Sequence, residues 1–287
     1  GFISGMHKSP FHGFSAEFSE HKVYNSGEST KHMDWKLYAK TDRLYTKRYE
    51  EETNLRCHII IDNSSSMHYP KLSSGQLFYE NKIGFSVLAS AVLMNILKKQ
   101  RDAVGLSVFS DSYEYYAPEK GSDRHHRMLL NVLENLLENQ TPKKTTDTVT
   151  YLHQIAEKMH RRSMILLFTD MFQSDEVSSS EEKLFAALQH LKHNKHKVVL
   201  FHVMDYKTEL SFDFDSAPRR FVDLESGEEI AVFADTIKEF YEKKMQDYFE
   251  KVAMTCAQNK IKYIPVSVGE NFEKILTAYL IEKQNFG

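Results

Sequence analysis

The chain has 287 residues, of which 41% are hydrophobic and 27% charged, and its formal net charge is −3. This composition is typical of a soluble globular protein with one large or two small domains, and it excludes collagen-like and disordered classes. The near balance of charges, without a concentrated basic stripe, argues against a dedicated nucleic-acid-binding protein.

The two cysteines, Cys57 and Cys256, form neither a disulfide framework nor a metal-binding spacing. We therefore expect buried, reduced thiols in a cytoplasmic protein. The most apolar helical stretch, Ile83–Leu97, is too short for a membrane span, and no segment has the pattern of a signal peptide. The 14 histidines include no His-Glu-x-x-His pattern, and we expect most of them at the surface.

Residues 1–54 are rich in aromatic and charged side chains and are punctuated by glycines. This composition predicts extended segments and turns, with a short helix within Met33–Ala39 and an edge strand over Arg43–Glu50. We expect this region to be an appendage packed on the main domain, because it is too small for an independent core. Its tryptophan, Trp35, is interpreted as an anchor.

Residues 55–287 are expected to form one main domain, in which strand and helix signals alternate. The predicted strands are Arg56–Asp62, Asp102–Ser110, Tyr113–Ala117, Ser163–Thr169, Lys197–Met204 and Ile261–Val266. The predicted helices are Phe78–Lys99, Met128–Leu137, Tyr151–His160, Glu181–His193, Thr236–Asn259 and Asn271–Gln284. This alternation predicts a doubly wound, mostly parallel α/β sheet, with Tyr113–Ala117 as an antiparallel edge strand. A hairpin insertion, of Arg220–Leu224 and Glu229–Phe233, is expected near residues 212–233.

The first of these strands ends in a run of oxygen-bearing side chains. Asp62, Ser64 and Ser66 follow the apolar run Ile59–Ile61 at short spacing. Ligands of open α/β sheets gather beyond the carboxyl ends of such strands, and hard cations bind oxygen. On the spacing alone, a cation site and a simple cap of the next helix are equally good interpretations.

Two further segments bring oxygens to the same expected edge. The loop Thr145-Thr146-Asp147 precedes a helix, and Asp170 follows the strand Ser163–Thr169. The carboxyl ends of parallel strands share one edge, so we expect these side chains to converge with Asp62. Two carboxylates and three hydroxyls would leave a magnesium ion with a position open to a partner's carboxylate. Because no neighbouring general base is evident, this set favours adhesion over hydrolysis.

The order Asp62-x-Ser64-x-Ser66, then Thr146, then Asp170 resembles the metal-ion-dependent adhesion site of von Willebrand factor A domains. The resemblance extends from the first apolar strand to the C-terminus and implies a von Willebrand factor A-like fold. It also implies a non-enzymatic protein–protein interaction module that holds Mg²⁺, or Mn²⁺ or Ca²⁺ in its place.

The same resemblance implies a role for each residue of the site. The two serines would bind the metal directly, and Thr146 would do so in the ligand-engaged state. Asp62 and Asp170 would act mainly through water or by orienting the hydroxyls. The glycine that usually stands near the threonine is replaced by Thr145, so Thr145 and Thr146 both remain candidate ligands.

A second resemblance concerns the front of the chain. The motifs that carry it are Gly13-Phe-Ser-Ala-Glu17-Phe18, Tyr24-Asn-Ser-Gly27, Asp34-Trp35-Lys36, Ala39-Lys40 and Tyr49-Glu-Glu-Glu52-Thr53. They are similar to the segment before the von Willebrand factor A domain in the bacterial domain-of-unknown-function 58 family, although Gly27-Glu28 replaces the usual Gly-Asp. Proteins of that family are commonly encoded beside MoxR-type AAA+ ATPases. The resemblance implies a bacterial adaptor whose partner is such an ATPase or its client.

Two alternative functions remain. One is a magnesium-dependent phosphohydrolase of the haloacid-dehalogenase type, which would need a second carboxylate where Ser64 stands. Two other classes are not favoured, because the chain has neither a P-loop nor the Gly-x-Ser-x-Gly elbow of serine hydrolases. An interaction module with an unused metal site is the other alternative, because an intact motif need not be loaded. Asp147, Thr148 and Thr150 are interpreted as caps of the following helix, and Asp205 as a turn or cap.

Overall fold

The computed structural model describes residues 16–25, 27, 29–51, 55–73, 75–110, 113–138, 148–159, 161–171, 179–193, 195–214, 218–222, 229–269 and 272–285. These residues fall into two compact units, one before Leu55 and one from Leu55 onward.

The N-terminal unit is built on the antiparallel strands β1 (Ala16–Val23) and β2 (Tyr45–Glu51). Between them lie a 3₁₀ turn, Thr30–His32, and the short helix α1 (Trp35–Thr41). Asp34 caps α1, because its side chain accepts hydrogen bonds from the first backbone N–H groups of the helix. The predicted helix and edge strand are both present. The Trp35 side chain is 62% exposed.

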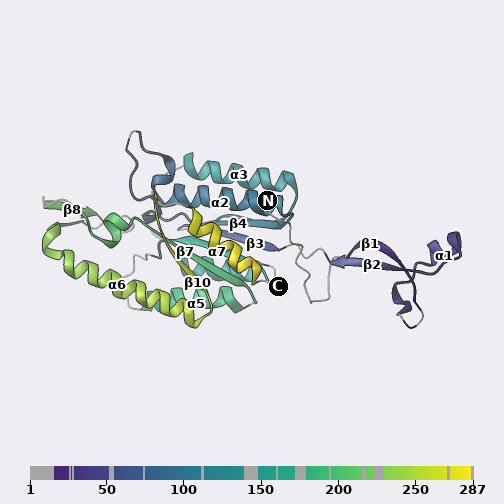
Figure 1. Ribbon diagram of the computed structural model, residues 1–287. Helices are drawn as coiled ribbons and strands as arrows, with labels where there is room; N and C mark the ends of the chain where they lie inside the picture. The colour runs from purple at the N-terminus through teal and green to yellow at the C-terminus, as the bar shows by residue number, and fades with distance from the viewer. Residues whose placement is uncertain are drawn as a thin grey trace. The chain divides into compact units, whose positions relative to one another are not determined.

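The larger unit is organised around a six-stranded sheet of order β10-β7-β6-β3-β4-β5 (Figure 1). Its strands are β3 (Arg56–Asp62), β4 (Ala103–Phe109), β5 (Tyr113–Lys120), β6 (Met164–Thr169), β7 (Lys197–Met204) and β10 (Lys262–Ser267). Every neighbouring pair is parallel except β4 and β5. The predicted α/β sheet with one antiparallel edge strand is confirmed.

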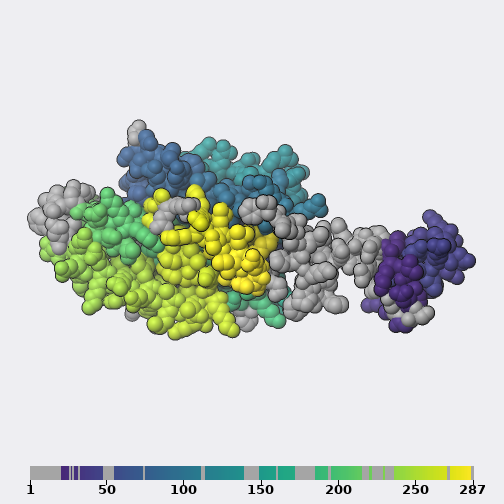
Figure 2. Space-filling view, viewed as in Figure 1, coloured from purple at the N-terminus to yellow at the C-terminus, as the bar shows by residue number. Residues whose placement is uncertain are grey.

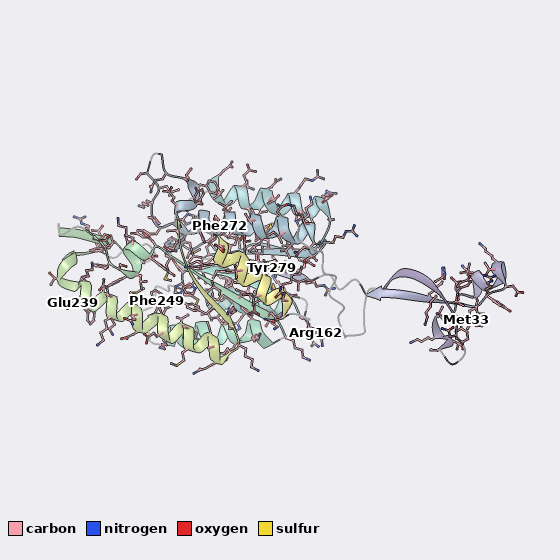
Figure 3. The ribbon with its side chains drawn as sticks, viewed as in Figure 1. Met33, Arg162, Glu239, Phe249, Phe272 and Tyr279 are labelled. Atoms are coloured by element: carbon pink, nitrogen blue, oxygen red, sulfur yellow. The ribbon has the colours of Figure 1, made fainter. Side chains whose placement is uncertain are left out.

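Helices cover both faces of this sheet. They are α2 (Lys82–Lys99), α3 (Asp123–Glu138), α4 (Thr148–Lys158), α5 (Ser179–His193), α6 (Ala234–Gln258) and α7 (Glu273–Gln284). Residues of α2, α3 and α7 share one hydrophobic core with the sheet, and residues of α4, α5 and α6 share the other. Figure 2 shows the outer surfaces of α6 and α7 in yellow-green and yellow. On the first face, Phe272, labelled in Figure 3, stacks on Phe85 of α2 with ring centroids 4.8 Å apart.

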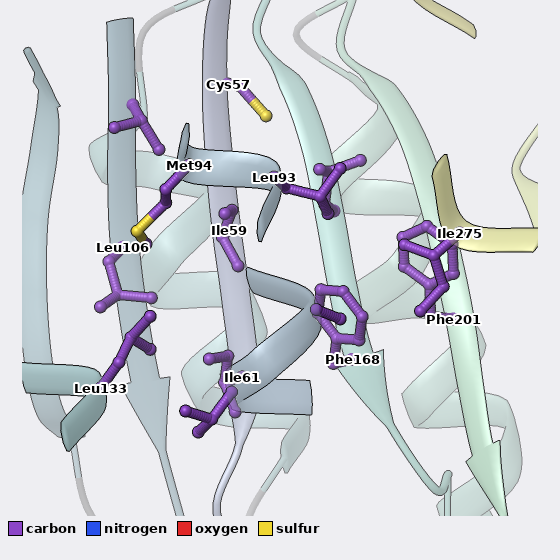
Figure 4. Packing of buried hydrophobic residues seen from close by; sticks show 14 of the residues in the cluster. Cys57, Ile59, Ile61, Leu93, Met94, Leu106, Leu133, Phe168, Phe201 and Ile275 are labelled. Carbon is purple, nitrogen blue, oxygen red and sulfur yellow. The ribbon is translucent and has the colours of Figure 1, made fainter. Parts of the chain in front are cut away.

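Strand β3 shows why these residues form an interior strand. Cys57, Ile59 and Ile61 belong to the core beneath α2, where Figure 4 shows Ile59 and Ile61 beside α2. Ile60 belongs to the opposite core, as the two-residue period of a strand requires. A strand buried on both faces tolerates a continuous apolar run, and each isoleucine contributes about 1.5–3 kcal/mol by leaving water. Asp62 ends the strand.

Helix α2 begins later than predicted, at Lys82 rather than Phe78. Residues Phe78–Glu80 form a 3₁₀ turn, and Asn81 caps α2 because its Oδ1 accepts the Gly84 N–H at 2.8 Å. Gly84 lies so close to this turn that a Cβ there would stand 1.8 Å from the Phe78 carbonyl oxygen. Only glycine therefore allows the turn and the helix to meet.

Five histidines are exceptions to the expectation that most of the 14 lie at the surface. His58, His125, His126, His196 and His202 are all buried. A neutral imidazole can be buried when its nitrogens find partners, and the partners of His58, His125 and His202 lie far away in the sequence. Helix α3 begins at Asp123 and not at the predicted Met128, and it therefore includes His125 and His126.

The remaining elements agree with the predicted pattern. A hairpin of β8 (Pro218–Val222) and β9 (Glu229–Phe233) interrupts the chain between β7 and α6. Cys57 and Cys256 are both free and buried, as expected. Within the described residues, no helix combines the length and the apolar character needed to cross a bilayer.

Candidate metal centre

The carboxylate of Asp62 is fixed at the end of β3 by bonds to two segments. Its Oδ1 accepts the backbone N–H of Ser64 at 2.9 Å, and its Oδ2 accepts the hydroxyl of Thr169, from the end of β6, at 2.7 Å. Burial and the nearby charge of Asp170 together raise the pKa of Asp62 to about 7, although both hydrogen bonds oppose the shift. A cation near Asp62 would therefore favour the ionised form of its carboxyl group.

The two serines follow directly. Ser64 is buried and its carbonyl accepts the Met67 N–H at 3.1 Å, which begins the 3₁₀ turn Ser66–His68. This turn brings the hydroxyl oxygens of Ser64 and Ser66 to 3.1 Å from each other. Adjacent ligands of an octahedral magnesium ion also lie about 3 Å apart, because each metal–oxygen bond is about 2.0–2.1 Å. The hydroxyl pair and the carboxylates therefore fit the donor set of a hard divalent cation.

Asp170 follows β6 and is fully buried. Its Oδ2 lies 2.8 Å from the Nζ of Lys82, the first residue of α2, and the same Nζ lies 2.5 Å from Oε1 of Glu209. Burial alone would lower the pKa of Lys82, but the charges of Asp170 and Glu209 outweigh it and hold that pKa above its ordinary value. The amino group is therefore an ammonium ion inside the site.

The backbone of Asp170 is held by His202 of β7. The Nε2 of His202 lies 2.8 Å from the Asp170 carbonyl oxygen, which can only accept, so this nitrogen carries the proton. The Nδ1 then accepts from the Tyr263 hydroxyl at 2.8 Å. Burial lowers the pKa of His202 to about 4 and keeps the ring neutral. Phe249 of α6, labelled in Figure 3, packs its ring edge against His202 with centroids 5.1 Å apart.

Glu209 belongs to a π-helical turn, Tyr206–Leu210, that follows β7. Asp205 caps this turn, as predicted, because its side chain accepts from the Lys207 N–H and from the Thr208 hydroxyl. Glu209 turns back to accept the Asp205 N–H at 2.7 Å. The Tyr69 hydroxyl donates to Thr208 at 2.8 Å, so the turn is also bonded to the loop that follows the serines.

Four predicted site residues, Asp62, Ser64, Ser66 and Asp170, lie at one edge of the sheet. Thr146 lies outside the described residues, with Thr145 and Asp147, so its role stays a prediction. Within the described part of the chain, no three His, Cys, Asp or Glu side chains form a group that could hold a metal ion. A metal ion at this edge would therefore need the serine hydroxyls as ligands in addition to the carboxylates.

Sequence reasoning missed Lys82 and Glu209. A lysine in a helix is normally exposed, and neither residue is spaced regularly from the Asp-Ser-Ser motif. One signal was available for Lys82, because a positive charge at the first position of a helix opposes the helix dipole. Such a lysine is placed there more readily when a carboxylate neutralises it.

A second buried polar cluster lies within the sheet. His58 of β3 places Nδ1 2.7 Å from Oε1 of Glu119 and Nε2 2.7 Å from the hydroxyl of Ser107. The ring stacks on Tyr116 with centroids 5.4 Å apart, and a Cβ on Gly105 would stand 2.6 Å from its Nδ1. The serine–histidine–acid order is that of a nucleophilic triad, but His58 and Ser107 have no exposed surface. This arrangement is structural.

The comparisons with known proteins agree with this fold. No curated protein matches the chain in sequence. The conserved hypothetical protein BatB from Bacteroides thetaiotaomicron has a TM-score of 0.50 and 14% identity, over 82% of this chain and 100% of that one. An aerotolerance-related membrane protein from Bacteroides fragilis has a TM-score of 0.50 and 17% identity, over 81% and 100%. At these identities the similarity shows the fold alone.

The strand order and the single antiparallel edge make the larger unit von Willebrand factor A-like. The VWA domain of SpRpn10 is a weaker structural match, with a TM-score of 0.40 and 14% identity over 79% of this chain and 95% of that one. Residues 20–271, most of the chain, match the family described as "Protein of unknown function DUF58". The protein therefore belongs to the DUF58 family.

Proposed function

We propose that this protein is a non-enzymatic interaction module that binds a divalent metal ion and, through it, an acidic residue of a partner protein. The proposed ligand set is Asp62, Ser64, Ser66, Thr146 and Asp170, and the proposed ion is Mg²⁺, with Mn²⁺ or Ca²⁺ as substitutes. The observation that carries the proposal is the pair of serine hydroxyls 3.1 Å apart beside two buried carboxylates.

Each residue has a distinct task in this proposal. Ser64 and Ser66 would hold the ion directly, and Thr146 would complete the protein's part of the shell. Asp62 would orient Ser64 through the bond to its N–H, and Asp170 would add the second negative charge. The ion, when bound, would supply a coordination position that a carboxylate of the partner fills.

The surroundings of the carboxylates favour binding over catalysis. Both oxygens of Asp62 accept hydrogen bonds within the protein, and one oxygen of Asp170 is paired with Lys82. A nucleophile or general base needs an oxygen directed at the reacting group. We infer that Asp62 organises the hydroxyl ligands and does not attack a substrate.

The proposed partner is a MoxR-type AAA+ ATPase or its client in the bacterial cytoplasm. Membership of the DUF58 family and the resemblance of the N-terminal motifs support this choice. We propose no nucleic-acid partner, because the net charge is −3 and no basic stripe is present in the sequence.

Metal binding is the first test. Isothermal titration with Mn²⁺ and Mg²⁺ should give one site in the wild type and none in the Ser64→Ala/Ser66→Ala variant. Ser110→Ala is a matched control, because this buried hydroxyl at the end of β4 donates to Glu114 and is not a proposed ligand. Binding that survives loss of both hydroxyls would contradict the proposal.

Partner binding is the second test. A MoxR-type ATPase from the same organism should be captured in Mg²⁺ and released by a chelator. Asp62→Ala should abolish capture while far-UV circular dichroism stays unchanged. Equal capture in chelator would instead support a module that works without metal. That second candidate is favoured by one observation, the ammonium group of Lys82 beside Asp170.

A further inference from the structure

Lys82 is the one described lysine that is fully buried. Its backbone is fixed, because its N–H donates to the Tyr69 carbonyl at 3.0 Å and its carbonyl accepts the Ser86 hydroxyl at 2.8 Å. The side chain leaves the start of α2 and ends at the carboxyl edge of the sheet, between Asp170 and Glu209. A buried ammonium group needs charged partners, since leaving water without them is costly.

The charges around this lysine are unequal in number. Among the described residues, the ammonium group of Lys82 faces the buried Asp170 and the part-buried Glu209, and the charge of Asp170 acts in turn on Asp62. When all are ionised, the cluster carries a net charge of −2, which one divalent cation neutralises. Without the lysine the charge would be −3.

We propose that Lys82 is a built-in cation that sets the charge of the metal site and weakens its hold on a divalent ion. The inference rests on the proposed function, and it adds a regulator of that same site. An ammonium group bonded to Asp170 repels a second cation beside Asp62 and neutralises part of the charge that would attract it. The site then binds the ion weakly, so that a carboxylate from the partner can raise the affinity of the site for the ion.

Glu209 competes with Asp170 for the ammonium group of Lys82. It takes part of the ammonium charge away from Asp170, and it is held in place by the Asp205 N–H and, through its carbonyl, by the Tyr241 hydroxyl of α6. The charge presented to the ion therefore depends on the turn Tyr206–Leu210 as well as on the ligands themselves. Removing Glu209 should shift the ammonium charge wholly onto Asp170.

The experiment is a charge cycle on the full chain. Mn²⁺ is titrated by calorimetry, and by the electron paramagnetic resonance signal of the free ion, into the wild type, Lys82→Met, Glu209→Gln and the double variant. Lys82→Met keeps the apolar stem but removes the charge, and should tighten Mn²⁺ binding about tenfold or more. Glu209→Gln should weaken it by a similar factor. The double variant restores the net charge of −2 and should bind within a few-fold of the wild type.

The possible outcomes separate this inference from the proposed function. If the wild type binds Mn²⁺ and Lys82→Met binds no more tightly, the inference is wrong and the proposed function stands. If none of the four proteins binds Mn²⁺, both are wrong. Lys82→Met leaves the buried Asp170 and the part-buried Glu209 without their ammonium partner, so folding is checked by thermal melting. If Lys82→Met does not fold, the Glu209→Gln variant tests the inference. A Mn²⁺ affinity of Glu209→Gln equal to or above that of the wild type overturns the inference.

Discussion

Two buried polar clusters include residues of strand β3, and they differ in the balance of their charged groups. The interior cluster consists of His58, Ser107 and Glu119, and each ring nitrogen of its histidine has a side-chain partner at 2.7 Å. Among the residues that the structure describes, the edge cluster, with Asp62 and Asp170 among its members, contains more carboxylates than ammonium groups. Burial alone thus does not mark a ligand site. The edge cluster differs in its excess of like charge at a strand end, which is the feature that the proposed metal site uses.

The largest expected effect concerns the interior cluster. Glu119→Ala removes the partner of a fully buried histidine nitrogen and should lower the free energy of unfolding by about 3–5 kcal/mol. Urea denaturation followed by circular dichroism measures this. Glu119→Gln, which keeps a hydrogen-bonding oxygen, should cost clearly less. A loss below 1 kcal/mol for the alanine variant would show that the cluster is not needed for stability.

A smaller effect is expected from the glycine that makes room for the histidine. In Gly105→Ala the new methyl group would lie 2.6 Å from His58 Nδ1 and 2.8 Å from the Ala117 carbonyl oxygen. Overpacking of this kind costs about 1–3 kcal/mol, measured as a lower midpoint in urea. Affinity for Mn²⁺ should not change, because the edge cluster is untouched. A matching fall in Mn²⁺ affinity would mean that the two clusters are coupled.

The smallest effect on folding is expected for a variant at Ser66. The same variant should show the clearest difference between the metal-free and the metal-bound protein. The side chain is only partly buried, so Ser66→Ala should change the unfolding free energy of the metal-free protein by no more than about 0.5 kcal/mol. With the ion at one hundred times its dissociation constant, the wild type should gain about 2.7 kcal/mol, and the variant should gain much less. Thermal melting with and without Mn²⁺ distinguishes these cases. Equal gains would exclude Ser66 as a ligand.

The fold was largely predictable because it depends on local patterns. The apolar run at Ile59–Ile61 gave β3 with its observed limits, since burial on both faces leaves an unmistakable composition. The start of α3 was missed because His125 and His126 look polar in isolation. The burial of His125 depends on a tertiary partner, the Val104 carbonyl near its Nε2, which no local pattern contains.

The candidate site was predictable only where its residues follow a strand. Asp62 and Asp170 were found because parallel strands end at one edge, and Ser64 and Ser66 because they lie two and four residues beyond Asp62 in the sequence. Lys82 and Glu209 could not be found in this way. They are positioned by a helix start and a π-helical turn, and only the folded chain brings their charges together.

The place of β3 in the sheet has a consequence for motion at the site. The strand is hydrogen-bonded to β4 on one side and β6 on the other, and its last six residues are buried. We expect its amide hydrogens to exchange with solvent only when the whole domain opens, whereas the 3₁₀ turn Ser66–His68, directly after it, can open locally. Asp62 would then stay fixed, together with Ser64, whose N–H it accepts, while the turn that carries Ser66 opens, so the two hydroxyls of the proposed site would differ in mobility.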